Sequence, residues 1–163
     1  VDQDKHKGLS AIAKIISENA SVHNAATKLL RTSDWDFMAV YYDMIDHFCH
    51  SFMKYHPPKL GGVDQNNYDI FKEAVTGSYI YQDMMLERKM KLIDEDTTVI
   101  IMSDHGFESG NKRILNMPKV QAAPSLEHRQ FGIFVASGPN IKKNEKKTCS
   151  PLKIRPVSTQ SCL

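Results

Sequence analysis

The most constraining feature of this sequence is a β-branched, apolar run at residues 97–102 that leads directly into the polar stretch 103–107. A nearly unbroken apolar run is typical of a strand buried on both faces, as in a parallel sheet covered by helices. Asp104 and His105 then follow the carboxyl end of the strand, where open α/β sheets place their binding residues. A carboxylate and an imidazole suit zinc or manganese. Because Asp and Gly also favour turns, a simple turn explains this stretch equally well when it is taken alone.

A second polar cluster follows another apolar, strand-like run, at residues 37–42. In this cluster Asp46 and His50 are four residues apart, so on a helix they would share one face, with Cβ atoms about 5–6 Å apart, and could bind the same ion. A lone Asp and His at this spacing more often form a solvated helix face. Asp43 and His47 do not share the face of Asp46 and His50, and we expect them to support the ligands or to face solvent.

The third candidate ligand is His128, which lies just before an apolar run at residues 131–137 and a turn at residues 138–140. It precedes a predicted strand, whereas the other candidates follow one. Taken alone, His128 would be interpreted as a surface loop histidine.

Taken together and in this order, the three motifs resemble the alkaline phosphatase superfamily, and most closely its type I phosphodiesterase and nucleotide pyrophosphatase group. The resemblance spans residues 34–143. It rests on Ile45-Asp46-x-x-x-His50-x-Phe52, on Ser103-Asp104-His105-Gly106-Phe107, and on His128-Arg129-x-x-Gly132-Ile133 followed by Gly138-Pro139-Asn140-Ile141-Lys142. It implies a three-layer α/β/α fold with a mainly parallel central sheet, of which this chain would hold the C-terminal half and which would therefore be incomplete.

The resemblance also implies a two-metal site that acts on phosphate esters or nucleotides. Asp46, His50 and His128 would hold one divalent ion, and Asp104 and His105 would contribute to the other. The ions are usually zinc in that family, and manganese is the alternative. Paired cations stabilise both the attacking and the leaving oxygen of an in-line displacement.

Some residues that the resemblance requires are not found in this sequence. In the family a further metal-binding aspartate and a Thr or Ser nucleophile lie upstream, and we assign no Ser or Thr of this chain as the nucleophile. Because the sequence begins with Val1, we interpret residues 1–148 as the C-terminal half of a catalytic domain, inactive or nearly so in isolation. Residues 149–163 should form a divergent tail, in which Lys153 occupies the position of the family's aspartate.

The predicted function is therefore that of a metal-dependent hydrolase of phosphate esters, of the phosphodiesterase or nucleotide pyrophosphatase type. A sulfatase, a phosphonate hydrolase or a phosphoglycerate mutase-like enzyme of the same superfamily stays open, because the discriminating residues would lie upstream. An alternative from another class is an inactive remnant that acts as a metal-binding or interaction module. Coincidence of the motifs is a third interpretation.

Composition is that of a globular chain of about one domain, with 163 residues, 41% hydrophobic residues and a formal net charge of +2. The sequence has no apolar run approaching the roughly 18 residues of a membrane-spanning helix. The basic stretch 142–147 has no aromatic residue and contains Glu145, so we expect no nucleic-acid binding. Three cysteines, Cys49, Cys149 and Cys162, have no metal-binding spacing, and Cys49 is expected to be a small core residue.

Helical spacing of apolar residues predicts two helices within residues 9–31, separated by a break around residues 17–21, and one long helix over residues 66–93. Residues 108–125 are expected to form an irregular loop between two site elements. Lys112, Arg113 and Arg129 could bind a phosphate, although we expect Lys112 and Arg113 to be solvated surface residues.

Overall fold

The computed structural model describes residues 7–121 and 123–142, and it divides the chain into two compact units. Residues 7–94, 107–121 and 123–127 belong to the first unit, and residues 95–106 and 128–142 belong to the second. The predicted tail at residues 149–163, with Cys149 and Cys162, lies outside the described residues.

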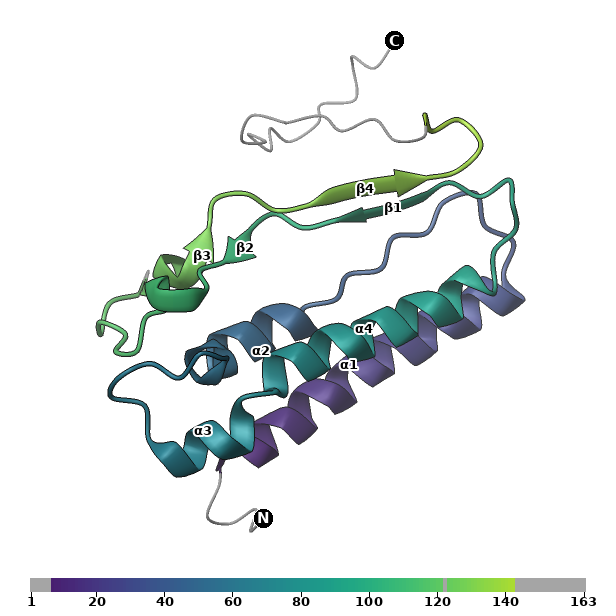
Figure 1. The fold of residues 1–163 in the computed structure, drawn as a ribbon. Helices are drawn as coiled ribbons and strands as arrows, with labels where there is room; N and C mark the ends of the chain where they lie inside the picture. The colour runs from purple at the N-terminus through teal and green to yellow at the C-terminus, as the bar shows by residue number, and fades with distance from the viewer. Residues whose placement is uncertain (1–6, 122, 143–163) are drawn as a thin grey trace. The chain divides into compact units, whose positions relative to one another are not determined.

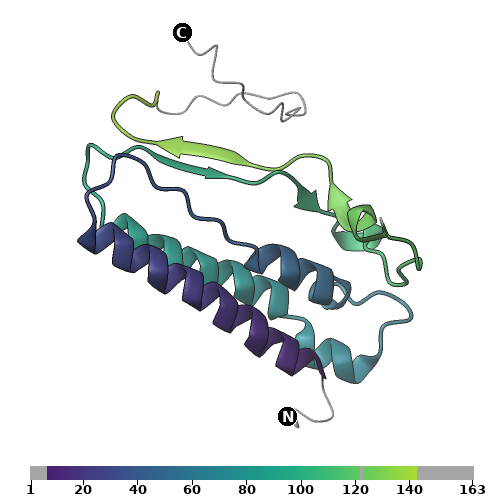
Figure 2. The same ribbon diagram turned by 180° about the vertical axis from the view of Figure 1, so that it is seen from behind.

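The first unit is mainly helical. It contains the α-helices α1 (Lys7–Thr32), α2 (Met44–Phe52), α3 (Gln65–Phe71) and α4 (Ala74–Met90), and the 3-10 helices η1 (Met53–Tyr55), η2 (Gly110–Lys112) and η3 (Ala123–Glu127). Helices α1 and α4 run side by side in both Figure 1 and Figure 2. None of the described helices is both long enough and apolar enough to cross a membrane.

Two helix boundaries differ from the prediction. Helix α1 is continuous, and the predicted break around residues 17–21 is wrong. The hydroxyls of Ser17 and Ser21 donate to the carbonyls of Lys14 and Ser17, each at 2.8 Å, so these serines make local bonds without interrupting the helix. The predicted single helix over residues 66–93 is instead α3 and α4, which are separated at residues 72–73.

The core of the first unit lies where α1, α2, α3 and α4 meet. Its buried members are Ile15, Met44, Phe48, Cys49, Phe52, Phe71 and Val75. Met44, Phe48 and Phe52 recur every four residues along α2, so one face of this helix is apolar and buried. Packing of that face fixes the rotation of α2 and leaves Asp46 and His50 on a partly exposed face. The prediction that Cys49 is a core residue is confirmed.

The second unit contains an antiparallel pair of strands, β1 (Val99–Met102) and β4 (Phe134–Ser137). Val99 is opposite Ser137 and Met102 is opposite Phe134. Two shorter strands, β2 (Gly106–Phe107) and β3 (His128–Arg129), form a separate two-stranded sheet. As predicted, Asp104 and His105 lie just beyond the end of β1, from which Asp104 is separated by Ser103 alone.

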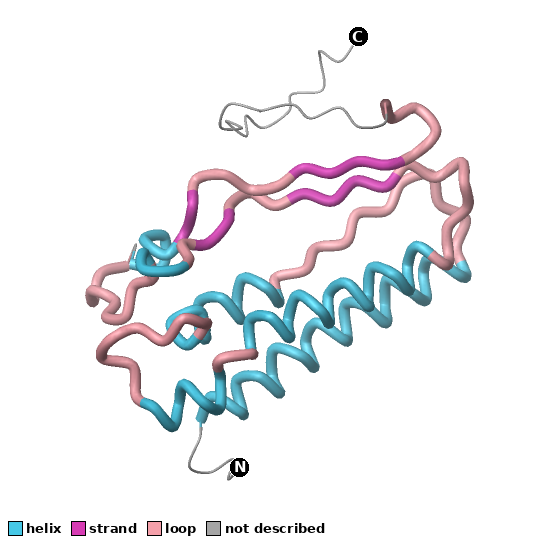
Figure 3. Tube along the Cα trace, viewed as in Figure 1, coloured by secondary structure: helices cyan, strands magenta, loops and turns pink. Residues whose placement is uncertain are grey.

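The mainly parallel central sheet predicted from the sequence is not observed among residues 7–121 and 123–142. The predicted strand at residues 37–42 belongs to the loop that joins α1 to α2 in Figure 3. Phe37 is 84% exposed and Tyr41 is 81% exposed, so this run is not buried on both faces. Nor is β1, in which Ile100 is 54% exposed. An apolar pattern indicates an extended chain, but a strand also needs a neighbour with which to share hydrogen bonds, and the pattern does not specify that neighbour.

Candidate metal centre

Helix α2 brings together the first pair of predicted ligands. Asp46 and His50 are one helical turn apart, and Nε2 of His50 lies 3.5 Å from Oδ1 of Asp46. The side chains are 35% and 24% exposed, so the pair is partly shielded from water yet accessible to an ion. The predicted arrangement of these two residues on one helix face is therefore confirmed.

The separation of this pair fits two ligands of one ion. In tetrahedral zinc sites, bonds of roughly 2.0–2.1 Å place neighbouring ligand atoms roughly 3.4 Å apart. The separation of 3.5 Å between Nε2 of His50 and Oδ1 of Asp46 is close to this value. It is longer than an ordinary N–H···O hydrogen bond, which is about 2.7–3.2 Å. The separation of the two atoms is therefore compatible with both being ligands of one divalent ion.

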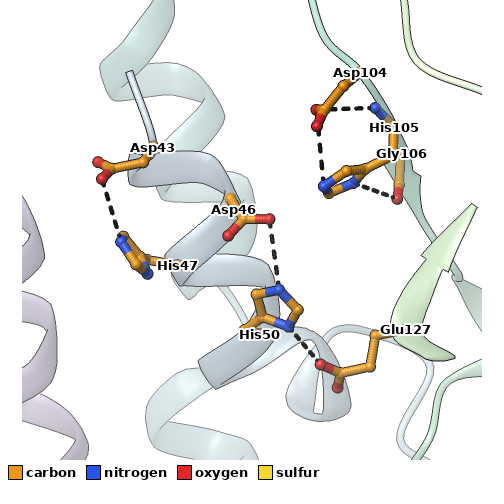
Figure 4. A network of polar contacts seen from close by, with 8 residues as sticks. All are labelled: Asp43, Asp46, His47, His50, Asp104, His105, Gly106 and Glu127. Atoms are coloured by element: carbon orange, nitrogen blue, oxygen red, sulfur yellow. Dashed lines mark hydrogen bonds and ion pairs between the residues drawn. The ribbon is translucent and has the colours of Figure 1, made fainter. Parts of the chain in front are cut away.

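The other nitrogen of His50 contacts a residue that the sequence analysis did not single out. Nδ1 of His50 lies 2.6 Å from Oε2 of Glu127, at the end of η3 (Figure 4). An ionised carboxylate only accepts hydrogen bonds, so Nδ1 carries the proton and, in a neutral ring, Nε2 presents its lone pair toward Asp46. The edge of the His50 ring also meets Phe107, with centroids 4.9 Å apart at 80°.

The second unit brings together Asp104, His105 and His128. Oδ1 of Asp104 accepts the backbone N–H of His105 at 3.0 Å and lies 3.7 Å from Nε2 of the same histidine. Nδ1 of His105 lies 3.2 Å from the carbonyl oxygen of Gly106, as Figure 4 shows. A carbonyl oxygen can only accept a hydrogen bond, so Nδ1 of His105 is the donor in this contact. The other ring nitrogen, Nε2, faces the carboxylate of Asp104. The His105 ring stacks on that of His128, with centroids 3.6 Å apart and an angle of 13°.

His50 and His105 thus share one arrangement of ring contacts. In His50 and in His105, Nδ1 faces an oxygen acceptor and Nε2 faces an aspartate. Metal-binding histidines typically donate their second ring N–H to a carboxylate or a backbone carbonyl, which fixes the tautomer and the orientation of the ring. The donor atoms and their supports are therefore compatible with a metal site.

Asp43 and His47 are more exposed than Asp46 and His50. Nε2 of His47 lies 3.3 Å from Oδ2 of Asp43, and each side chain is 49% exposed. These two residues form an exposed pair along α2, separate from the pair Asp46 and His50 in Figure 4. This agrees with the prediction that they do not share the ligand face, and it makes them suitable control positions.

Arg113 is buried, with 6% of its surface exposed, so the prediction that it is a solvated surface residue is wrong. Its guanidinium group donates to the backbone carbonyls of Gly110, Met53, His56 and Pro58. These carbonyls lie in η2, in η1 and in the loop that follows η1, so Arg113 holds together the segments beyond the C-terminal end of α2. It is therefore not available to bind a phosphate.

Cys49 is adjacent to His50 but is not a suitable ligand. Burial raises the pKa of its thiol to about 12, and the negative charges of Asp46 and Glu127 act in the same direction. At neutral pH the group is therefore a thiol, whereas metals bind the thiolate.

Each of these donor pairs is a candidate part of a divalent-metal site, and the chain that carries them is a mixed α and β protein. The family model for type I phosphodiesterase / nucleotide pyrophosphatase matches residues 2–150, so the chain belongs to this family of hydrolases. The family that the motifs resembled is thereby confirmed, while the role of each ligand residue stays a prediction. No curated protein and no solved structure matches the chain.

Proposed function

We propose that this chain supplies metal ligands to a hydrolase that cleaves phosphodiester or pyrophosphate bonds in nucleotides or related phosphate esters. Membership of the family supports the reaction class. The observation that carries the proposal is the separation of 3.5 Å between Asp46 and His50, with the second nitrogen of His50 held by Glu127.

One ion would be held by Asp46, His50 and His128, each of which offers one ligand atom. Carboxylate oxygen and imidazole nitrogen are donors for zinc, and manganese is the alternative metal. His128 is assigned to this ion because the resemblance of the three motifs to the family implies it.

A second ion would be held in part by Asp104 and His105, which lie next to each other after β1. This assignment is supported by the same pattern of ring contacts as in His50. When bound, divalent ions polarise phosphoryl oxygens and lower the pKa of a coordinated water or hydroxyl. The two aspartates supply negative charge to the ions, and the two histidines present neutral nitrogens at Nε2.

Elemental analysis of the purified chain tests whether the first ion is bound. We expect about one zinc per chain, since a site with three protein ligands is sufficient to retain this metal. His50→Ala and His128→Ala should each remove it, whereas His47→Ala, on the exposed side of α2, should retain it. Metal content that is unchanged in His50→Ala would overturn the proposal.

Substrate turnover gives a separate readout. With bis(p-nitrophenyl) phosphate and added zinc, the chain should show little or no hydrolysis, because we assign none of its Ser or Thr residues as the nucleophile. Efficient hydrolysis that is lost in His50→Ala would contradict the prediction of an inactive chain while supporting the metal site.

A further inference from the structure

We propose that Glu127 is a positioning residue that fixes the tautomer and the orientation of the His50 imidazole, and through it the affinity for zinc. This inference rests on the proposed metal site. It adds a residue that no motif in the sequence identified.

The contact between the two side chains is short and shielded. Oε2 of Glu127 lies 2.6 Å from Nδ1 of His50, and the side chains are 14% and 24% exposed. A hydrogen bond to an ionised carboxylate is roughly twice as strong as one between neutral groups. At these exposures the surrounding protein screens the bond less than bulk water would. The carboxylate of Glu127 therefore favours the tautomer of His50 that carries the proton on Nδ1.

The position of Glu127 is itself fixed by the backbone. Glu127 ends η3, which begins at the buried Ala123, and its carbonyl accepts the backbone N–H of Glu108 at 2.8 Å. Phe107, the residue before Glu108, provides the aromatic contact to the edge of the His50 ring. Glu127 in η3 and Phe107 in β2 thus both restrain the imidazole of His50, and all three residues belong to the first unit.

The Nδ1 atom of His105 also faces an oxygen acceptor, but this acceptor is of a different kind from the one in His50. Nδ1 of His105 contacts the carbonyl of the next residue, Gly106, so its support comes from the backbone and cannot be removed by substitution. In His50 the same role falls to a side chain that is 77 residues away in the sequence. Glu127 is therefore the position where the support of a ligand histidine can be tested by mutation.

The first experiment measures the tautomer in the metal-free protein by long-range ¹H–¹⁵N NMR of the imidazole nitrogens. The His50 signals are assigned by their loss in His50→Gln. The spectra are compared at a pH at which the ring is neutral, and in the wild type we expect the tautomer with the proton on Nδ1 to dominate over the tautomer with the proton on Nε2. Glu127→Ala should redistribute His50 between the two tautomers, while Glu127→Gln, whose amide oxygen still accepts a bond, should largely retain the wild-type form. An unchanged His50 tautomer in Glu127→Ala would overturn the inference.

The second experiment measures the affinity for Zn²⁺ by competition with a chelator. Loss of a carboxylate that supports a metal-binding histidine typically weakens binding about 10- to 100-fold, and we expect a loss of this size for Glu127→Ala. Glu127→Gln should lose less, and Asp43→Asn, which removes the exposed partner of His47, should bind as the wild type does. Equal losses in Glu127→Ala and Asp43→Asn would refute a specific role of Glu127, and far-UV circular dichroism confirms that each variant is folded.

The two proposals fail in different ways. If the wild type binds no Zn²⁺ but Glu127→Ala changes the His50 tautomer, Glu127 orients His50 and the proposed function is wrong. If the wild type binds Zn²⁺ and Glu127→Ala alters neither the tautomer nor the affinity, the proposed function stands and the role of Glu127 is refuted.

Discussion

Replacement of Arg113 by methionine is expected to destabilise the first unit by about 3 kcal/mol. Methionine retains much of the apolar volume of the side chain but donates no hydrogen bonds. The substitution would therefore leave four carbonyl groups, those of Gly110, Met53, His56 and Pro58, without their charged donor.

The magnitude follows from two opposing contributions. A hydrogen bond from a charged group contributes roughly 1.5–3 kcal/mol, so four such bonds contribute roughly 6–12 kcal/mol. Because Arg113 is only 6% exposed, desolvation of the cation offsets several kcal/mol of this gain. A net loss of about 3 kcal/mol corresponds to a decrease in melting temperature of about 6–12 °C for a chain of this size.

Urea unfolding followed by the fluorescence of Trp35, the single tryptophan of the chain, measures this loss within the first unit. Lys112→Met is a matched control, because it removes the same charge from the neighbouring exposed position, and its effect should be within about 0.5 kcal/mol of zero. If Arg113→Met were as stable as Lys112→Met, the bonds to the four carbonyls would not stabilise the fold and the reasoning would be refuted.

Two further predictions concern the core of the first unit. Asn19 is 2% exposed, its amide nitrogen lies 3.2 Å from each of the sulfur atoms of Met44 and Met85, and its Oδ1 has no hydrogen-bond partner among the described residues. Asn19→Leu should therefore raise the free energy of unfolding by about 1 kcal/mol in a urea titration, and a decrease of that size would show that the amide is stabilising. Cys49 is fully buried with a thiol pKa of about 12, so at pH 9 its alkylation, followed by peptide mass spectrometry, should be slow until urea unfolds the protein. Rapid labelling of the folded chain would contradict this burial.

The proximity of the candidate ligands Asp46 and His50 on α2 could be predicted because all the necessary information is local. Spacing of four residues places Asp46 and His50 on one helix face, and the apolar residues Met44 and Phe48 determine which face is buried. The position of Asp104 and His105 after a strand is likewise predictable from the sequence, because the apolar run ends at Met102, two residues before Asp104.

The features that were missed depend on partners far away in the chain. Glu127 contacts a histidine 77 residues earlier, and Arg113 donates to a carbonyl 60 residues earlier. Residues 37–42 have the composition of a strand, but the pairing that makes a sheet is a property of two segments and not of one. The parallel sheet was inferred from single runs, whereas the observed pairing of β1 is antiparallel and joins it to β4.

Zinc K-edge X-ray absorption of the zinc-loaded chain tests most directly whether Asp46 and His50 are ligands of one ion. The spectrum should show imidazole nitrogens and a carboxylate oxygen at about 2.0–2.2 Å, with less imidazole scattering in His50→Ala and no change in His47→Ala. A zinc coordination shell that is identical in the wild type and in His50→Ala would contradict the account.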